Sequence, residues 1–516
     1  MGLPEFKLIA ADSEEYSFPS GKHTLLIFVK EDCPTCHLSM PLINTAFETF
    51  NSKINVLVIG QEEKGNRELI EKYDLSVPVL DDSSLSASFS YDLDTVPTII
   101  LADSSGEEIR RFVGFGRNDW RALYAHLAEL SGIMPPEINW DEYPESRPGC
   151  GSLSVEPGIA ERLEAESTGS PLRARHMEIG SGDDIHEFFY DQGLTDGLPV
   201  VPPTAERVLK MLSGTPRDAQ DIVITAPPNL TPVTVEKVAI NAVMAGCRAE
   251  YLPLVVSAVR AVLQPEYNLH GTLATTRFVG PVVIVNGPIA QQIGMNGKGN
   301  ALGQGNRANA TIGRAVQLAI RNIGGGKPQG VDRATLGNPG KLSYCFCEDE
   351  DSSAWEPLTV DRGLAAGTNA VTVFAGYGLQ GVIDDKARSP EELVQTFATS
   401  LHAVDNIHKI PGPDCLLVVC PEHEATLMEG GWDKARFHAE LMARMQRPAE
   451  DVMRGTHGMA EGVPAKMAGK TVPKILPTGL LIVRAGGGAG KFSGIIAGWT
   501  PGTPESSRPV TKEIKA

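Results

Sequence analysis

The chain has 516 residues, of which 42% are hydrophobic and 21% are charged, and its formal net charge at pH 7 is −18. This length predicts about two to four globular domains with ordinary hydrophobic cores. The acidic balance argues against nucleic acid or an anionic membrane as a partner, because a phosphate-rich surface would be repelled. Since no apolar run approaches the ~18 residues of a membrane helix, we also expect no membrane span.

The first residues, from Met1 to Lys7, lack the charged start and the apolar core of a signal peptide. We therefore expect a cytoplasmic protein. In a reducing compartment, the eight cysteines are expected to be thiols or catalytic pairs rather than structural disulfides.

The first 132 residues alternate between buried strands and helices, as an α/β domain does. Apolar runs predict strands at 24–29, 54–59, 97–101 and 108–113. Helical spacing predicts helices at 36–50, 66–73 and 118–130.

A Cys-x-x-Cys pair, Cys33 and Cys36, lies between the first of these strands and the first helix. Cys33 is thereby placed at a helix N-terminus, where free N–H groups and the helix dipole stabilise a thiolate. Cys36 follows one helical turn later and can resolve a mixed disulfide. The pair predicts a redox centre, provided that the Cys33 thiolate is within reach of a partner sulfur. Zinc is the alternative, but no second pair of Cys or His ligands follows nearby, so no metal is expected.

Further residues show that segment 1–132 resembles the thioredoxin-like superfamily. Pro41 lies five positions after Cys36, where these proteins carry a proline, and Val96-Pro97-Thr98 precedes an apolar strand. Gly114 and Gly116 match the last hairpin of the family. The resemblance implies a thioredoxin-like fold in which Pro97 is cis and faces the dithiol.

Two details distinguish this segment from a minimal thioredoxin. The extra residues 78–93 are similar to the TlpA-like branch of the superfamily. Glu31 and Asp32 stand before the first cysteine, where the family usually has a tryptophan. We expect their negative charges to oppose formation of the thiolate.

The pattern is lost between residues 133 and 178, where proline, glycine and serine are frequent. We predict a linker with one short helix at 158–167. Cys150 lies in this stretch, in the sequence Pro-Gly-Cys-Gly-Ser. Two interpretations stay open: a mobile shuttle or substrate thiol for Cys33, or an incidental exposed cysteine, which the sequence alone favours.

Residues 179–516 form a large α/β domain, either as one body or as two lobes. Strands are predicted at 222–225, 281–285, 371–374, 415–419, 479–483 and 495–497, in a mixed or parallel sheet. Helices are predicted at 234–245, 252–263, 308–323 and 390–402.

Two glycine-rich loops follow strands of this domain, at 294–309 and 484–493. The first leads into a helix, whose free N–H groups could bind a carboxylate or phosphate. A purely structural loop is the alternative. The loops at 286–309, 420–431 and 484–493 are expected to line one crevice, because ligands bind beyond the C-terminal ends of strands in open α/β sheets. The candidate ligand-binding residues are His270, Arg277, Asn296, Lys298, Asn306, Arg307 and Asn309.

Four cysteines of this domain are candidates for reactive thiols. Arg248 beside Cys247 favours a thiolate there. Cys345 and Cys347 would share one face of a strand, where they either accept an attack from Cys33 or pack as small apolar residues. Cys420 ends a strand close to His423, which is a candidate acid–base group.

The second half also resembles, over short stretches at 196–203 and 306–314, the large domain associated with UGSC-type (seleno)proteins. Cys150-Gly151-Ser152 is a partial match to the Cys-Gly-Ser-Cys of their redox modules. This resemblance assigns no reaction to the chain.

Together these observations predict a thiol–disulfide redox protein without a cofactor. Its Cys33/Cys36 dithiol would deliver electrons from an external donor to a substrate or thiol held by the C-terminal domain. The substrate would be a small-molecule or protein thiol or disulfide, and a homo-oligomer is compatible with the sequence. In the alternative, the second half is a lyase or hydrolase for a small sulfur-containing or carboxylate compound, and the dithiol keeps Cys247 or Cys345 reduced. A third class, an interaction module that only holds a partner, is also open.

Overall fold

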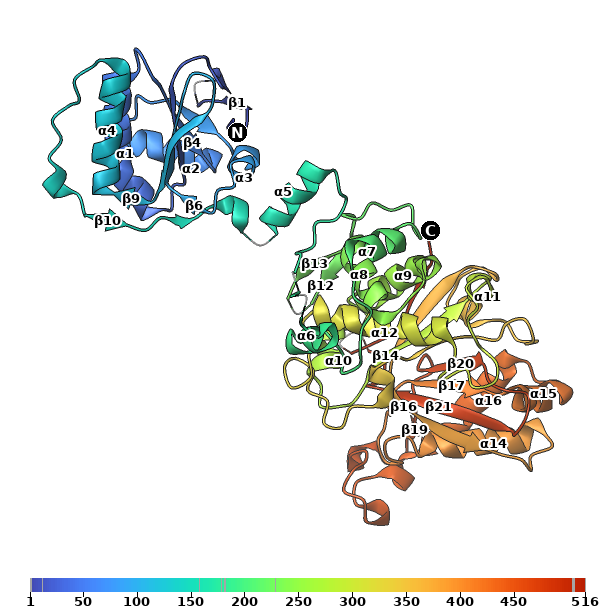
Figure 1. Ribbon diagram of the computed structural model, residues 1–516. Coiled ribbons are helices and arrows are strands. Elements are labelled where there is room, and N and C mark those ends of the chain that lie inside the picture. Colours follow the sequence, from blue (N-terminus) through green and yellow to red (C-terminus); the bar gives the residue numbers. More distant parts are fainter. Residues whose placement is uncertain are drawn as a thin grey trace. The chain divides into compact units, whose positions relative to one another are not determined.

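A five-stranded mixed sheet organises the N-terminal part of the computed structural model (Figure 1). Its strand order is β5-β4-β3-β7-β8, with β4 parallel and β7 antiparallel to the central β3. The strands are β3 (Thr24–Val29), β4 (Asn55–Gly60), β5 (Val79–Asp81), β7 (Thr98–Ala102) and β8 (Glu108–Val113). All six residues of β3 are buried, as expected of a central strand covered on both faces.

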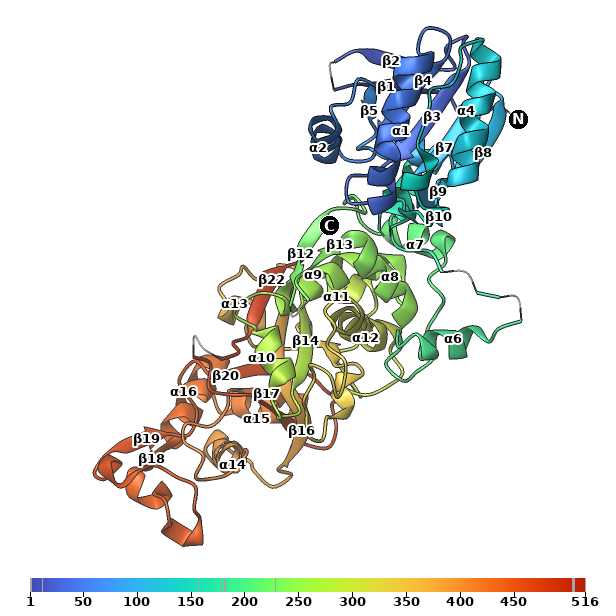
Figure 2. The ribbon, with the colours of Figure 1, turned by 90° about the vertical axis from the view of Figure 1, so that its left-hand side faces the viewer.

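Three long helices belong to this sheet: α1 (Pro34–Phe50), α2 (Glu63–Tyr73) and α4 (Arg117–Ser131). Helix α1 contacts both others, and Figure 2 shows it between them. The remaining elements are β1 (Phe6–Ile9), β2 (Glu15–Phe18), α3 (Ser86–Ser90), β6 (Thr95–Val96), β9 (Phe115–Gly116), β10 (Ser146–Arg147), β11 (Cys150–Gly151) and α5 (Ile159–Thr168). The predicted strands and helices of this part are present, each within a few residues of the expected bounds, and the thioredoxin-like fold is confirmed.

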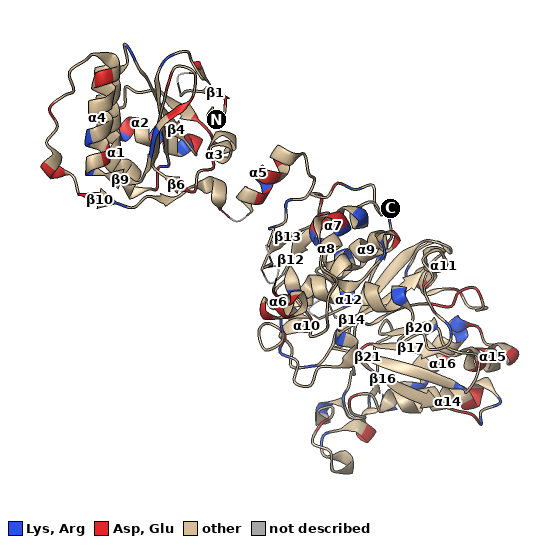
Figure 3. Cartoon of the chain, viewed as in Figure 1, with Lys and Arg blue, Asp and Glu red and all other residues tan. Residues whose placement is uncertain are grey.

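The chain divides into two compact units, residues 1–177 and 178–516. The structure describes residues 2–11, 13–156, 158–177, 179–180, 182–227, 229–503 and 506–515. Figure 3 shows that basic and acidic residues are interspersed along the ribbon of both units. Among the described residues, no helix is long and apolar enough to cross a membrane.

The stretch predicted as a linker differs from the prediction. Strand β10 pairs with β9, and β11 pairs with β6, so residues 146–151 are part of the first unit. The aromatic residues before them also pack on this unit, where Tyr143 stacks on Phe115 at a ring distance of 5.8 Å. Helix α5 is present at nearly the predicted position. The proline and glycine residues of this stretch therefore allow a tight course along the unit rather than a free linker.

The second unit is built on a seven-stranded mixed sheet with the order β15-β14-β16-β21-β17-β20, in which β22 also pairs with β16. These strands are β14 (Gly280–Asn286), β15 (Cys345–Cys347), β16 (Ala370–Ile383), β17 (Cys415–Val419), β20 (Leu480–Arg484), β21 (Phe492–Gly498) and β22 (Val510–Glu513). Two-stranded pairs are formed by β12 (Ile222–Ala226) with β13 (Thr231–Thr234) and by β18 (Gln446–Pro448) with β19 (Thr471–Pro473). The predicted large α/β part is thus present.

Alternate residues of β17 feed two different cores, as the two-residue period of a strand requires. Leu417 packs in one core with Phe397 and Phe437 of covering helices, whereas Leu416 packs in the other with Phe346. The helices of this unit are α6 (Ile185–Asp191), α7 (Ala205–Leu212), α8 (Val235–Ala245), α9 (Leu252–Val262), α10 (Leu269–Ala274), α11 (Ile289–Gln292), α12 (Arg307–Asn322), α13 (Leu358–Asp361), α14 (Pro390–His402), α15 (Pro421–Glu429) and α16 (Lys434–Arg444).

Candidate active site

Cys33 is the N-cap residue of α1, directly after the central strand of the first unit. Its sulfur accepts a hydrogen bond from the backbone N–H of Cys36 at 3.4 Å. The Val96–Pro97 peptide bond is cis, as the family resemblance implies, and the carbonyl oxygen of Val96 lies 3.5 Å from the Cys33 sulfur. The strand end, the helix start and the proline loop thus meet at one sulfur atom.

The two cysteines have opposite acidities. Hydrogen bonds from Cys36, from Cys150 and from the backbone N–H groups of Cys36 and Thr35 outweigh burial and lower the pKa of Cys33 to about 5. Burial, reinforced by the hydrogen bond to Cys33 and by its charge, raises the pKa of Cys36 far above its ordinary value. At neutral pH this pair is one thiolate and one thiol, which are the forms that attack and resolve a disulfide.

The expected opposition from the two acidic residues before the site does not dominate. The Asp32 carboxylate lies 3.2 Å from the Lys30 ammonium group, and a carboxylate oxygen of Glu31 lies 4.0 Å from His37. The side chain of Asp32 is 64% exposed, so that water screens its charge. The pKa of Cys33 is lowered despite both carboxylates.

A third thiol completes the site. Cys150 lies opposite Val96 in the antiparallel pair of β11 and β6, and the carbonyl oxygen of Val96 is the one that lies 3.5 Å from the Cys33 sulfur. The Cys150 side chain is thereby near enough to Cys33 to help lower its pKa. Two residues before Cys150, the carbonyl oxygen of Pro148 accepts a hydrogen bond from the Thr35 hydroxyl at 2.7 Å. The backbone of Cys150 is therefore fixed beside the dithiol and is not part of a mobile segment, and an exchange between Cys150 and Cys33 stays a prediction.

Cys33 and Cys36 are both 0% exposed. This differs from the expectation that the attacking sulfur is open to a partner. The Cys150 side chain is nevertheless near enough to Cys33 to influence its pKa. The sequence signal that could have revealed this arrangement is Gly149, which directly precedes Cys150 and allows the chain to approach a strand closely.

Comparisons with known proteins concern the N-terminal part of the chain. Residues 1–124 match the sequence model of the Redoxin family. Thiol-disulfide oxidoreductase ResA of a Bacillus cereus strain is 25% identical over 97 residues, which are 18% of this chain and 56% of that protein. The chain thus spans little more than half of the curated relative that it matches.

Solved structures with a similar fold include StoA from Bacillus subtilis, with 21% identity, 23% of this chain and 96% of that chain covered, and a TM-score of 0.21. The thioredoxin domain of a thiol-disulfide oxidoreductase from Bacteroides vulgatus has 18% identity, covers 25% of this chain and 96% of its own, and gives a TM-score of 0.23. With the Redoxin match and the geometry above, the N-terminal part of the chain is a thioredoxin-like domain similar to thiol–disulfide oxidoreductases.

In the second unit, three of the expected reactive cysteines are unsuited to attack. Burial raises the pKa of Cys247 to about 12, and the charge of Arg307 only partly offsets it. Burial likewise raises the pKa of Cys347 to about 12 and that of Cys345 well above its ordinary value. The neighbouring arginine in the sequence was misleading, because these thiols lie in the core and not at an electropositive surface.

Cys420 and His423 are different, because they form a polar cluster with Ser493. The Ser493 hydroxyl accepts a hydrogen bond from the backbone N–H of Cys420 at 3.0 Å and lies 2.7 Å from Nδ1 of His423. Although burial acts in the opposite direction, hydrogen bonding between the two side chains lowers the pKa of Cys420 and raises that of His423. Cys420 is also the N-cap residue of α15, where the helix dipole favours a thiolate.

The polar side chains of the glycine-rich loop at 294–309 mostly form hydrogen bonds within the protein. Asn306 caps α12 through the backbone N–H of Asn309 at 3.0 Å, and the Asn309 side chain donates to the carbonyl oxygen of Asn296 at 2.8 Å. The Arg307 guanidinium group donates to the carbonyl oxygen of Gly246 at 3.0 Å, whereas Lys298 is exposed. These contacts favour the structural interpretation of this loop.

The other two proposed ligand contacts lie elsewhere. Arg277 forms an ion pair with Asp405, which also accepts a hydrogen bond from Tyr377 at 2.7 Å. His270 is an exposed residue of α10. In the part of the chain that the structure describes, no group of three or more His, Cys, Asp or Glu residues is placed to hold a metal ion.

The three loops expected to line one crevice do meet. The backbone N–H of Gly486 donates to the carbonyl oxygen of Gly297 at 2.9 Å, and that of Lys491 donates to the Glu422 carboxylate at 2.8 Å. Two hydrogen bonds thereby join the loops that follow β14, β17 and β20.

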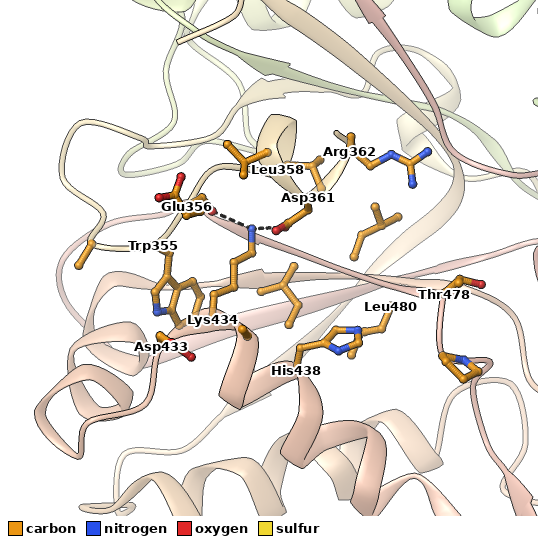
Figure 4. A pocket seen from close by; sticks show the side chains of 16 residues that line it. Trp355, Glu356, Leu358, Asp361, Arg362, Asp433, Lys434, His438, Thr478 and Leu480 are labelled. Atoms are coloured by element: carbon orange, nitrogen blue, oxygen red, sulfur yellow. Dashed lines mark hydrogen bonds and ion pairs between the residues drawn. The ribbon is translucent and has the colours of Figure 1, made fainter. Parts of the chain in front are cut away.

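A pocket of about 600 Å³ lies elsewhere in the second unit, near the start of β20 (Figure 4). The Lys434 ammonium group contacts the carbonyl oxygen of Glu356 at 3.0 Å and the Asp361 carboxylate. The side chains of Leu358 and Leu480 form an apolar part of the pocket wall. Sequence patterns gave no signal for this pocket, because its lining comes from three separate segments.

Proposed function

We propose that the chain is a thiol–disulfide oxidoreductase in which the Cys33/Cys36 dithiol delivers electrons to a substrate or thiol held by the second unit. The observation that supports this most strongly is the opposite direction of the two pKa shifts at the start of one helix. Fusion on one chain raises the effective concentration of the acceptor to about the millimolar range for a suitable linker.

The reaction begins when the Cys33 thiolate attacks one sulfur of a disulfide substrate. A Cys33–substrate disulfide forms, and the first substrate sulfur leaves as a thiolate. The charge on Cys33 is then gone, and with it one of the causes that raise the pKa of Cys36. Cys36 loses its proton to the leaving thiolate and attacks the Cys33 sulfur, which releases the second substrate sulfur as a thiolate that takes up a proton from solvent. The substrate gains two electrons, and an external thiol donor must reduce the Cys33–Cys36 disulfide.

Reduction of insulin disulfides by the full chain tests this proposal. Cys33→Ser should abolish turnover, and the double variant Cys36→Ser/Cys150→Ser should stop at a mixed disulfide on Cys33. Cys247→Ser is the matched control, because that thiol is buried and has a raised pKa, and its rate should stay within about twofold of wild type. Turnover by Cys33→Ser equal to that of wild type would refute the proposal.

A second candidate function is supported by the cluster around Cys420. A cysteine with a lowered pKa beside a histidine with a raised pKa, at a helix start, is the arrangement of a cysteine nucleophile with its acid–base partner. In this alternative the second unit is a lyase or hydrolase for a small sulfur-containing or carboxylate compound, and the dithiol keeps its cysteine reduced. Cys420 takes the role that the sequence assigned to Cys247 or Cys345. The cytoplasmic location and a homo-oligomeric state remain predictions from the sequence.

A further inference from the structure

Residues 146–151, which we call the cap segment, cover the redox site of the first unit. At the start of the segment, Ser146 and Arg147 pair with Gly116 and Phe115. At its end, Cys150 and Gly151 pair with β6, the short strand before Pro97. Beyond its end, the backbone N–H of Ser152 donates to the carbonyl oxygen of Asp94 at 2.9 Å.

A buried polar network fixes the residues that follow the cap segment. The side chain of Gln61 donates to the Ser152 hydroxyl at 2.6 Å and accepts from the backbone N–H of Leu153 at 3.1 Å. The Ser154 hydroxyl donates to the carbonyl oxygen of Leu93 at 3.1 Å. Ser152 and Ser154 are both buried. The segment is therefore anchored at both ends and holds Cys150 in a defined position.

Close packing requires glycine in the cap segment. A Cβ atom at Gly149 would lie 2.4 Å from the carbonyl oxygen of Val96 and 2.5 Å from the Thr95 side chain. A Cβ atom at Gly151, two residues further, would meet nothing within 4 Å. The approach of the chain to β6 is thus tightest immediately before Cys150.

An extended peptide that adds to a strand edge gains its affinity from backbone hydrogen bonds. The cap segment does this within its own chain, and it brings a sulfur to the attacking sulfur. We propose that the cap segment is an internal substrate mimic, in which Cys150 is the built-in exchange partner of Cys33 and an incoming disulfide protein must displace β11 from β6. This inference rests on the proposed function of the dithiol.

The exchange needs no further oxidant once the Cys33–Cys36 disulfide exists. Cys150 gives its proton to solvent and attacks the Cys33 sulfur. The Cys33–Cys150 bond forms, the Cys33–Cys36 bond breaks, and Cys36 leaves as a thiolate that takes up a proton. The number of disulfides is unchanged. If Cys33 instead carries an external thiol, attack by Cys150 releases that thiol and leaves the same internal disulfide.

Glutathione disulfide and the full-length Cys36→Ser variant provide the direct test, with mass spectrometry of the cysteine peptides as readout. We expect an internal Cys33–Cys150 disulfide, with two hydrogens lost and no glutathione on either residue. The double variant Cys36→Ser/Cys150→Ser should retain glutathione on Cys33. Stable glutathione on Cys33 beside a free Cys150 in the single variant would overturn the inference but leave the proposed function intact. An unreacted Cys33 in both variants would contradict the proposed function as well.

Alkylation of the reduced protein by iodoacetamide tests the covering role separately. Gly149→Ala should displace the cap segment from β6, because the added methyl group has no room. The rate of alkylation of Cys33 should then increase by about tenfold, since local opening becomes easier. Gly151→Ala is the matched control and should react within about twofold of wild type, because its methyl group meets open space. Thr35→Val, which removes the hydrogen bond to Pro148, should also accelerate the reaction. Equal rates in Gly149→Ala, Thr35→Val and wild type would refute the covering role.

Discussion

Cys420 and His423 lie one helical turn apart at the start of α15, and both contact the Ser493 hydroxyl in a buried cluster of the second unit. Each group shifts the pKa of the other in the direction that favours a thiolate–imidazolium pair. Cys415, at the other end of the same strand, is completely buried, and this burial together with the charge of Asp414 raises its pKa. Cys415, at the start of β17, and Cys420, just after its end, therefore differ in their expected reactivity.

We predict that iodoacetamide modifies Cys420 at pH 7 in preference to Cys415, once the protein is allowed to open locally. His423→Ala should slow the modification of Cys420 by about tenfold, because the thiolate loses its charged hydrogen-bond partner. Peptide mapping by mass spectrometry provides the measurement, and Cys415 is the internal control. Equal modification of the two cysteines would contradict the assignment of Cys420 as a nucleophile.

Arg314 of α12 holds the Asp196 carboxylate with two hydrogen bonds of 2.8 Å. Both side chains are largely buried, and Arg314 also donates to the carbonyl oxygen of Pro199 at 3.0 Å. We expect Arg314→Ala to lower the free energy of unfolding by about 3 kcal/mol, because the carboxylate is left without its partner. Arg314→Lys should recover only part of this loss, since an ammonium group cannot form the two-pronged contact.

The same pair predicts a dependence of stability on pH. Although burial acts against it, the hydrogen bonds and charge of Arg314 lower the pKa of Asp196. A carboxyl group with a lowered pKa in the folded state stabilises above its unfolded pKa of about 3.9, and this contribution is lost as pH falls further. Urea unfolding measured at several pH values between 3 and 6 should therefore show a free energy of unfolding that depends less steeply on pH in Arg314→Ala than in wild type. The same dependence on pH in both proteins would contradict the role of the ion pair.

Asp414 should change the dependence of stability on pH in the opposite direction to Asp196. Burial raises its pKa to about 6, although the backbone N–H of Gly502 donates to its carboxylate at 2.9 Å. The folded state therefore binds this proton more tightly than the unfolded state. The resulting stabilisation is present below pH ~4 and is lost as pH rises through about 6.

Asp414→Asn provides the measurement for that group. Relative to this variant, the wild-type protein should lose on the order of 2–3 kcal/mol of stability between pH 4 and pH 7. Thermal unfolding followed by circular dichroism at each pH gives the comparison. Parallel curves for the two proteins over this range would contradict a raised pKa at Asp414.

Much of the fold follows from local sequence patterns. The apolar run at 24–29 and the helical spacing after Cys36 predict β3 and α1 because each element is long and regular. The site residues Cys33, Cys36 and Pro97 are equally accessible to prediction, since their chemistry lies in short motifs. In the structure these residues lie together in a single cluster of side chains and backbone groups around the Cys33 sulfur.

The course of residues 133–155 could not be predicted in the same way. The pairing of β11 with β6 joins segments that are distant in the sequence, and Pro148 and Gly149 individually indicate a turn or linker. Burial is the second limit. Arg248 next to Cys247 suggests a thiolate, but the position of that thiol in a core is set by packing that no local pattern encodes.

The proposed function requires that Cys33 is ionised at neutral pH while Cys36 is not. The most direct measurement is the pH dependence of thiolate absorbance at about 240 nm in the full chain, with Cys33→Ser as the reference. We predict a titration near pH 5 that is present in wild type and absent in the variant. A difference spectrum that titrates only near the ordinary thiol pKa of about 8.5 would contradict the account.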